Sequence, residues 1–577
     1  MRKRGAEAAT TQIGRLGAED QSRAFRPASR IAVVLAVVLA SLACAPSQAS
    51  PPMNGAGVFS PAPSPPPTLE AAIRHAVDLG PADATTIVSL SFGLNVRDPQ
   101  GLAQLISSGR TVSPDTYAAE FGPDPVAVQA AVATLQGAGF RTSWRPGSSV
   151  IAADGSAPLA AALLHVAIDS FRQPDGTTFY AALAEPQIPP QLARLASNVS
   201  GLDNYRRAHS RAVRRGGLTP TDVLAFYNLK PLRQAGLDGT GQTIVLPEID
   251  DLPNFSDLNK FALEFGLPPF DSSNLTVKRD PSWGTPLKPQ GETVLDLEII
   301  HEIAPGAKLV VYLSAPDFGH GDRAFDQMVT DHLGSIISES LGACEPDTPS
   351  GHRNTYASIQ DRAVAQGMSH FVASGDNGAF TCGEDQGPAG SFPATLPTVT
   401  AVGGTTVFES EQGVYFKESA WGGPVEESGS GGGPSLFYTL PAYQKSVSQA
   451  LGHGFRQIPD VSADADPATG FHIVFQGKDG QAGGTSASTP LWAATVALIN
   501  QDMKKKGLRE VGFANPALYW MGENSSKLPA KPFHDVTTGN NLAYNAGLGW
   551  DFATGWGSMD GAALDAAWIL YMKGGGG

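Results

Sequence analysis

The sequence predicts an α/β fold with a mostly parallel sheet flanked by helices, preceded by a smaller α+β unit. From residue 218 onward, short apolar strand candidates alternate with helical stretches. Such alternation is typical of a parallel sheet that carries helices on both faces. Strands are expected at 243–246, 308–312, 335–338 and 370–373, with helices at 292–304 and 355–366.

The smaller unit is expected at 67–200, where strand and helix candidates follow one another less regularly. A helix at 124–137 is predicted from its recurring apolar positions, among them Val126, Val128, Val132 and Leu135. Strands are expected at 86–92, 148–153 and 178–184, with further helices at 99–107 and 157–170.

Two segments without a clear hydrophobic pattern divide the chain. Residues 50–66 are rich in Pro, Ser and Ala and are expected to form a linker. Residues 201–217 are basic and polar, which predicts an exposed connector that proteases can reach. A solvated helix face is the alternative for this second segment. The larger unit then occupies 218–577.

Composition excludes some function classes. The 577 residues are enough for about two to four domains. The formal net charge is −15 and only 16% of residues are charged, so no nucleic-acid partner is expected. Few Lys and Arg residues also limit positive self-repulsion in acid, which is compatible with an acidic working environment.

Residues 1–49 resemble an export signal region, because an apolar run at 31–45 follows several basic residues. Ser47 and Ala49 supply the small side chains that signal peptidase requires, and the run is too short for a transmembrane helix. We therefore expect a secreted protein without stable membrane insertion. Lipid anchoring through Cys44 is the less favoured alternative, because its surroundings make a poor lipobox.

Two cysteines remain after signal cleavage, Cys344 and Cys382. In an exported protein such a pair favours one disulfide. Two buried free thiols are the alternative.

The segment 483–490, Gly-Gly-Thr-Ser-Ala-Ser-Thr-Pro, offers a candidate nucleophile in Ser486. An apolar, helix-compatible run follows directly, so Ser486 is expected at a helix N-terminus, where N–H groups and the helix dipole favour negative charge. Acyl transfer requires both a nucleophile and donors for an oxyanion at one point. An ordinary N-cap serine is the alternative.

A base for Ser486 is expected among carboxyl groups. His320 is the histidine alternative, but its local sequence does not fit a His-based triad. Glu292 and Asp296 are four residues apart and therefore share one face of a helix. Two carboxyls held close in a partly dry site influence each other's titration, so one can take the serine proton while the other orients it. An exposed acidic patch is the alternative.

A third acidic residue, Asp376, follows the strand candidate at 370–373. Parallel sheets place their functional sites at this carboxyl end. A protonated Asp376 would donate a hydrogen bond to an oxyanion, whereas an Asx-type turn is the alternative.

These motifs together resemble the sedolisins, or serine-carboxyl peptidases, and the likeness covers nearly all of the chain after the signal region. Within that family it is similar to the secreted acid peptidases of the prokumamolisin type. Gly483 and Asn377 depart from residues that are common in the family, but neither removes a reactive group. The segments that carry the resemblance are 484–490, Glu292-x-x-x-Asp296, 374–376, 94–97, 113–117, 340–345 and 459–467.

The resemblance implies a subtilisin-like peptidase domain at 218–577. It also implies that 67–200 is an activation prodomain, which acts as an intramolecular inhibitor until cleavage in or near 201–217. The reactive groups that it implies are the nucleophile Ser486, the general base Glu292, its orienting partner Asp296 and the oxyanion donor Asp376. A carboxylate base agrees with activity in acid, at pH of about 3–5, where an imidazole would be protonated.

Near the C-terminus, carboxylates and glycine-rich turns offer oxygen ligands that suit a hard cation such as Ca²⁺. Ordinary turns are the alternative from the pattern alone. The resemblance implies one calcium ion, held by the Asp535 and Asp551 side chains and by the carbonyls of Val536, Gly547 and Gly549.

The sequence therefore predicts a monomeric, secreted acid endopeptidase that cleaves proteins or peptides. A tripeptidyl exopeptidase of the same family is one alternative. The other is a non-catalytic exported binding protein on the same fold, which the complete set of reactive groups disfavours.

Overall fold

The computed structural model describes residues 69–174, 176–205, 217–409, 414–423, 428–448 and 454–575. The expected signal region, the first linker and most of the connector at 201–217 lie outside the described residues. Within the described ranges, no helix is both long and apolar enough to cross a membrane.

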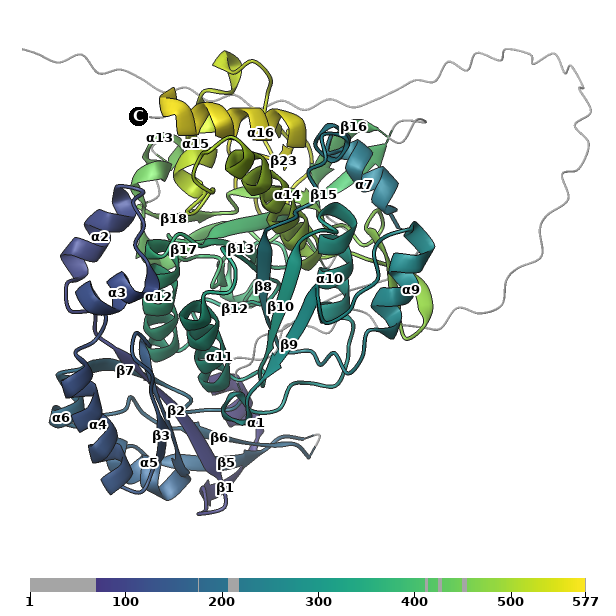
Figure 1. Cartoon of the computed structure of the whole chain (residues 1–577). Helices are drawn as coiled ribbons and strands as arrows, with labels where there is room; N and C mark the ends of the chain where they lie inside the picture. The colour runs from purple at the N-terminus through teal and green to yellow at the C-terminus, as the bar shows by residue number, and fades with distance from the viewer. Residues whose placement is uncertain are drawn as a thin grey trace, which may run out of the picture. The chain divides into compact units, whose positions relative to one another are not determined.

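An eight-stranded sheet forms the centre of the larger unit (Figure 1). Its order is β16-β15-β13-β11-β8-β10-β9, with β19 also paired to β15, and all of these pairs are parallel except β15–β16. This confirms the predicted parallel sheet. The bounds are β8 Thr243–Glu248, β9 Leu275–Arg279, β10 Lys308–Leu313, β11 Ile336–Glu339, β13 Ser369–Ala373, β15 Thr400–Glu409, β16 Tyr415–Ala420 and β19 Val461–Asp464.

Both faces of this sheet are buried under apolar cores. Alternate residues of each strand point to opposite faces, so each strand contributes to both cores. In β8, Ile244 and Leu246 join one apolar core and Val245 joins the other. Long helices on each face contribute to these cores, two of them on either side. These are α10 Glu292–Ile303 and α14 Thr485–Lys505 on the first face, and α11 Phe318–Asp331 and α12 Ser350–Ala365 on the second.

The smaller unit contains two antiparallel sheets, of order β3-β4-β2-β7 and β1-β5-β6. Its strands and larger helices are β1 Val77–Pro81, β2 Ile87–Leu94, β3 Arg141–Ser143, β4 Val150–Ser156, β5 Ile168–Arg172, β6 Thr178–Ala182, β7 Ala196–Ser200, α2 Pro99–Ser107, α4 Pro125–Gly137 and α5 Ala157–Leu164.

The predicted helix at 157–170 was wrong in its second part. Helix α5 ends at Leu164 because His165 takes the left-handed conformation, with φ of 49°. The chain then re-enters a strand, in which Ile168 and Phe171 are buried. At 124–137 the prediction was closer, since Asp124 is the N-cap and accepts a hydrogen bond from the Val126 N–H.

The smaller unit packs closely on α11 and α12. A Cβ atom on Gly351 would lie 2.0 Å from the Val199 carbonyl oxygen, and one on Gly319 would lie 2.6 Å from that of Ser89. Both glycines are therefore required by close approach of the β7 and β2 backbones. Polar pairs surround these contacts, among them Ser91–Gly319 at 2.9 Å, Asp154–Arg323 at 2.7 Å and Ser200–Asp322 at 2.5 Å.

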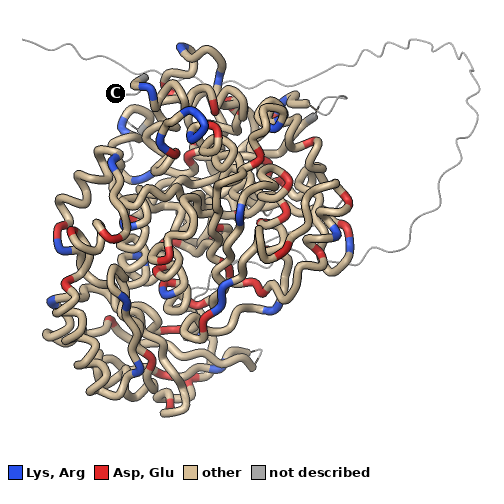
Figure 2. The backbone as a smooth tube through the Cα atoms, in the orientation of Figure 1, with Lys and Arg blue, Asp and Glu red and all other residues tan. Residues whose placement is uncertain are grey.

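Charges of both signs are interspersed along the described chain (Figure 2). Cys344 and Cys382 form a disulfide with their Cα atoms 5.0 Å apart. The structure thus contains the predicted bridge.

Candidate functional site

Ser486 is the second residue of α14, directly after the N-cap Gly484 and Thr485. It is 3% exposed. Its hydroxyl lies 3.4 Å from the Ser340 carbonyl oxygen and also hydrogen-bonds Glu292. Pro490 lies within the same helix, and because proline has no N–H it cannot donate to the carbonyl four residues earlier, which is that of Ser486. The Ser340 hydroxyl lies 3.1 Å from this oxygen.

Helix α10 packs against α14 and presents the predicted pair of carboxyls. Asp250 fixes the start of α10, because its side chain accepts the N–H groups of Gln290, Gly291 and Glu292 at 2.6, 2.8 and 2.9 Å. Glu292 and Asp296 lie one turn apart and are both buried. The exposed acidic patch that was the alternative is therefore excluded.

Burial dominates the electrostatics of this pair. It raises the pKa of Glu292 well above its ordinary value, Asp296 and Asp376 raise it further by charge repulsion, and the hydrogen bond from Ser486 lowers it. Burial also raises the pKa of Asp296 to about 8, while hydrogen bonds with Ser340 and Glu248 lower it. The Ser486 hydroxyl thus favours negative charge on Glu292.

Glu248 is a third buried carboxyl, which the sequence reasoning missed. It ends β8, and burial together with repulsion from Asp296 and Glu292 raises its pKa well above the ordinary value. Thr293 donates to it at 3.2 Å. The predicted strand ends at Leu246, whereas β8 continues to Glu248. A carboxyl group that directly follows an apolar strand is the sequence signal that points to Glu248.

Asp376 follows β13, as predicted, and its side chain contacts Thr485, the first residue of α14. Its Oδ1 accepts the N–H of Thr485 at 2.7 Å and the hydroxyl of Thr485 at 2.8 Å. The Gly375 N–H in turn donates to the Thr485 hydroxyl at 3.1 Å. The half-buried carboxyl group of Asp376 is therefore held against Thr485, the residue that precedes Ser486. Asp376 accepts the helix N–H that a capping residue would accept.

His320 belongs to a different environment. Its Nδ1 lies 2.7 Å from Asp317 Oδ2 near the N-terminus of α11, which covers the other face of the sheet. It is paired with Asp317 rather than with Ser486.

A small cavity of about 60 Å³ adjoins the carboxyl ends of β8 and β11. Apolar side chains line much of it, including Ile249, Leu341, Tyr356 and Phe392. Two of these lining residues directly follow residues that contact Asp296: Ile249 follows Glu248, and Leu341 follows Ser340.

Four of the residues predicted to bind calcium form two contacting pairs near the C-terminus. Asp535 accepts the Gly549 N–H at 3.1 Å, and Asp551 accepts the Gly547 N–H at 2.8 Å. Burial raises the pKa of Asp551 to about 6, so an adjoining cation would help to keep it charged in acid. Two carboxylates around a glycine loop with available carbonyls fit an oxygen-coordinated cation.

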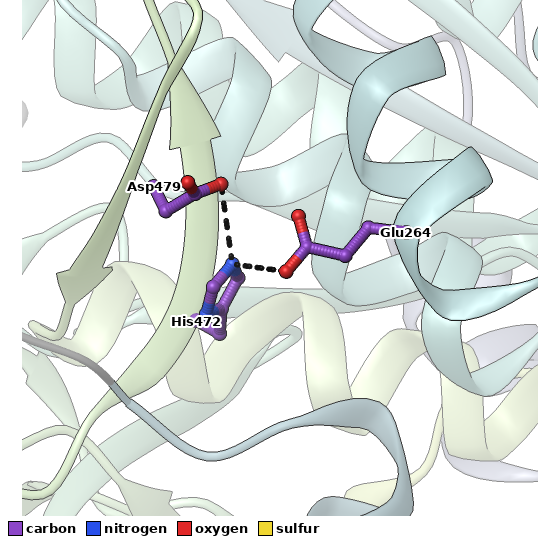
Figure 3. Close-up of side chains that lie close together, drawn as sticks. All are labelled: Glu264, His472 and Asp479. Atoms are coloured by element: carbon purple, nitrogen blue, oxygen red, sulfur yellow. Dashed lines mark ion pairs between the residues drawn. The ribbon is translucent and has the colours of Figure 1, made fainter.

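One further cluster among the described residues combines a histidine with two carboxyls (Figure 3). His472 Nε2 lies 3.8 Å from Glu264 and 3.9 Å from Asp479. The Lys260 ammonium group already lies 2.6 Å from the same Asp479 oxygen. Lys260 thus supplies a positive charge to this surface cluster.

Known protein families match both units of the chain. Residues 74–205 match the pro-kumamolisin activation domain, and 284–557 match the subtilase family. The chain is 31% identical over 536 residues to sedolisin of Pseudomonas sp. (strain 101), covering 85% of this chain and 89% of that protein. It is 35% identical over 434 residues to kumamolisin of Bacillus sp. (strain MN-32), covering 69% and 75%.

Two further relatives extend the comparison. Tripeptidyl-peptidase 1 of Canis lupus familiaris is 25% identical over 545 residues, which cover 85% of this chain and 93% of that protein. The solved structure of Pseudomonas sedolisin with two molecules of pseudo-iodotyrostatin is 31% identical, with a TM-score of 0.55, and the match covers 62% of this chain and 99% of that one. The chain therefore belongs to the sedolisin family of serine-carboxyl peptidases, which combine a subtilase-like fold with an activation prodomain.

Proposed function

We propose that this peptidase is a secreted endopeptidase that cleaves proteins in acid and is made as a self-processing zymogen. The observation that carries the proposal is the buried pair Glu292 and Asp296 beside Ser486. A carboxyl base of this kind keeps working where an imidazole would be protonated.

The proposed reaction assigns one role to each group. Glu292 takes the Ser486 hydroxyl proton as the oxygen attacks the peptide carbonyl, and Asp296 orients Glu292 during the transfer. A protonated Asp376 donates to the resulting oxyanion, which acid favours. Glu292 then gives its proton to the leaving amine. A water molecule hydrolyses the acyl-enzyme by the same route, with Glu292 first accepting and then returning a proton.

Calcium binding is part of the proposal. Asp535 and Asp551, with the carbonyls of Val536, Gly547 and Gly549, would hold one ion. Its charge would stabilise the fold of this loop by balancing the two carboxylates.

Cleavage of a denatured protein tests the activity. Because burial raises the pKa of Glu292, we expect the acid limb of the rate profile to lie above pH ~4.3, the ordinary glutamate pKa. The optimum would then fall in the upper part of the acid range or just above the window of about pH 3–5 that ordinary carboxyl pKa values set. Negligible cleavage throughout the acid range would contradict the proposal.

Tripeptidyl-peptidase activity is the second candidate, because relatives with that name cover long stretches of this chain. Substrates with a blocked N-terminus separate the two activities. An endopeptidase cuts them internally, whereas a tripeptidyl peptidase requires a free N-terminus and would leave them intact.

Self-processing is tested by acidifying the purified zymogen and its Ser486→Ala variant, with mass spectrometry of the products over time. We expect cleavage in or near 201–217 only in the wild type. Maturation of Ser486→Ala at the wild-type rate would assign the processing to another protease.

A further inference from the structure

We propose that Ser340 is a positioning residue that links the protonation of Asp296 to the backbone of the nucleophile Ser486. This inference rests on the proposed function of the same site. The Ser340 hydroxyl oxygen lies 2.9 and 2.8 Å from the two carboxyl oxygens of Asp296 and 3.1 Å from the Ser486 carbonyl oxygen. Ser340 is 3% exposed, so water does not readily replace these contacts.

The hydroxyl of Ser340 has one hydrogen and faces three acceptor atoms. A charged acceptor forms the stronger hydrogen bond, so an ionised Asp296 draws the Ser340 hydrogen to itself. A protonated Asp296 can instead donate its own hydrogen to the Ser340 oxygen. The Ser340 hydrogen is then released to the Ser486 carbonyl.

The Ser486 carbonyl oxygen lacks its usual hydrogen-bond donor within the helix. In a regular α-helix the N–H of residue 490 would donate to it, but residue 490 is proline. Ser340 therefore supplies a donor where the helix lacks one. The Ser340 carbonyl also lies 3.4 Å from the Ser486 hydroxyl, so one residue contacts both the backbone and the side chain of the nucleophile.

The charges around Asp296 help to determine whether it is ionised or protonated. Glu292 lies one turn earlier on α10, Glu248 reaches Asp296 from β8, and Asp250 and Asp376 add negative charge nearby. Burial raises the pKa of Asp296 to about 8. In acid Asp296 therefore holds its proton, which is the state in which Ser340 serves the nucleophile.

The test compares Ser340→Ala and Ser340→Thr with the wild type. Because the Ser340 hydrogen bond lowers the pKa of Asp296, its removal should move the alkaline limb of the kcat profile to higher pH. Loss of the donor to Ser486 should lower kcat about 10-fold, the equivalent of one neutral hydrogen bond, with KM little changed. Ser340→Thr should restore both properties.

Ser338→Ala is the matched control, because Ser338 is a buried serine two residues before Ser340, in β11, and its hydroxyl has no hydrogen-bond partner among the described residues. We expect wild-type kcat and a wild-type pH profile from it. If Ser340→Ala does not fold, Ser340→Cys replaces it, since a thiol keeps the shape but is a weak donor.

A second readout does not depend on activity. In the Ser486→Ala zymogen, difference infrared spectroscopy follows protonated carboxyl groups during a pH titration, and Asp296→Asn identifies the Asp296 band. We expect the midpoint of that band to move to higher pH on adding Ser340→Ala. An unmoved midpoint and an unmoved alkaline limb would overturn the inference even if kcat fell. Absence of wild-type cleavage would contradict only the proposed function, because the infrared midpoint would still decide the role of Ser340.

Discussion

Glu292 experiences two opposing influences, each with a clear physical origin. Its place in the first turn of α10 favours a negative charge through the helix dipole, whereas its burial favours the neutral acid. The hydrogen bond from Ser486 lowers the pKa of Glu292, whereas the negative charge of Asp296 raises it. The Ser486 hydroxyl thus favours the charged form of the base that we propose for it.

At this scale we predict that Glu292→Gln abolishes peptide cleavage and leaves the fold intact. Glutamine keeps the shape of glutamate but cannot accept the serine proton. Cleavage rates and circular dichroism would measure the two effects. The matched control is Glu298→Gln on the same helix, a buried carboxyl that instead accepts the Val474 N–H at 2.8 Å. Equal loss of activity in both variants would contradict a specific role for Glu292.

At the scale of elements, two loops contact Thr485 and Ser486 at the start of α14. One follows β11 and contains Ser340, and the other follows β13 and contains Asp376. The Cys344–Cys382 disulfide joins them. These loops follow parallel strands that are separated in the chain by one helix, α12, so the covalent link limits their relative motion at the site.

Replacing both cysteines by serine should therefore lower stability and activity together. The bridge closes a sequence separation of 38 residues, for which a stabilisation of about 2–4 kcal/mol is typical. Urea unfolding of the Ser486→Ala zymogen would measure the loss, and kcat of the mature enzyme would report loop mobility. Unchanged values of both would show that packing alone fixes the loops.

The C-terminal loop permits a separate test of calcium. We predict that added Ca²⁺ raises the Tm, that a chelator lowers it, and that Asp551→Asn removes this response. In strong acid the response should disappear, because protonated carboxyls no longer bind the ion. Glu264→Gln, in the cluster with Lys260, should leave it unchanged. A Tm that still responds to calcium in strong acid would contradict the proposed ligands.

For the whole molecule, the pH dependence of stability follows from carboxyl groups buried outside the reactive pair. Burial raises the pKa of Glu298 and Glu302 well above ordinary values and that of Glu418 to about 7. These groups are neutral in both folded and unfolded chains at low pH. As the pH rises above about 4.3 they ionise first in the unfolded chain, so stability is present in acid and is lost toward neutral pH.

We predict that the unfolding free energy of the Ser486→Ala zymogen falls between pH 5 and 7, as urea titrations at each pH would measure. Glu302→Gln should reduce the slope by up to about 1.4 kcal/mol per pH unit, because glutamine does not titrate. Arg74 and Glu70, which form an exposed ion pair, provide a control, and Glu70→Gln should leave the slope unchanged. An unaltered slope in Glu302→Gln would show that this group already ionises in the fold.

The sequence predicted the sheet because apolar runs such as 308–312 must be buried on both faces. The Glu292–Asp296 spacing likewise predicted a shared helix face. Other features depend on contacts between distant segments, which a local pattern does not contain. The carboxyl cluster gains Glu248 only because β8 lies beside α10, and helix α5 stops at His165 because the following residues pack as a strand.

The close contacts of Gly319 and Gly351 with the smaller unit have a consequence for the evolution of this sequence. Both positions exclude a side chain only while the β2 and β7 backbones are present. A larger side chain at either position would clash with the smaller unit in the zymogen. The proposed release of that unit would remove the clash. Laboratory selection on the separated peptidase domain should therefore let these two positions drift, whereas selection on the full chain should keep them as glycine.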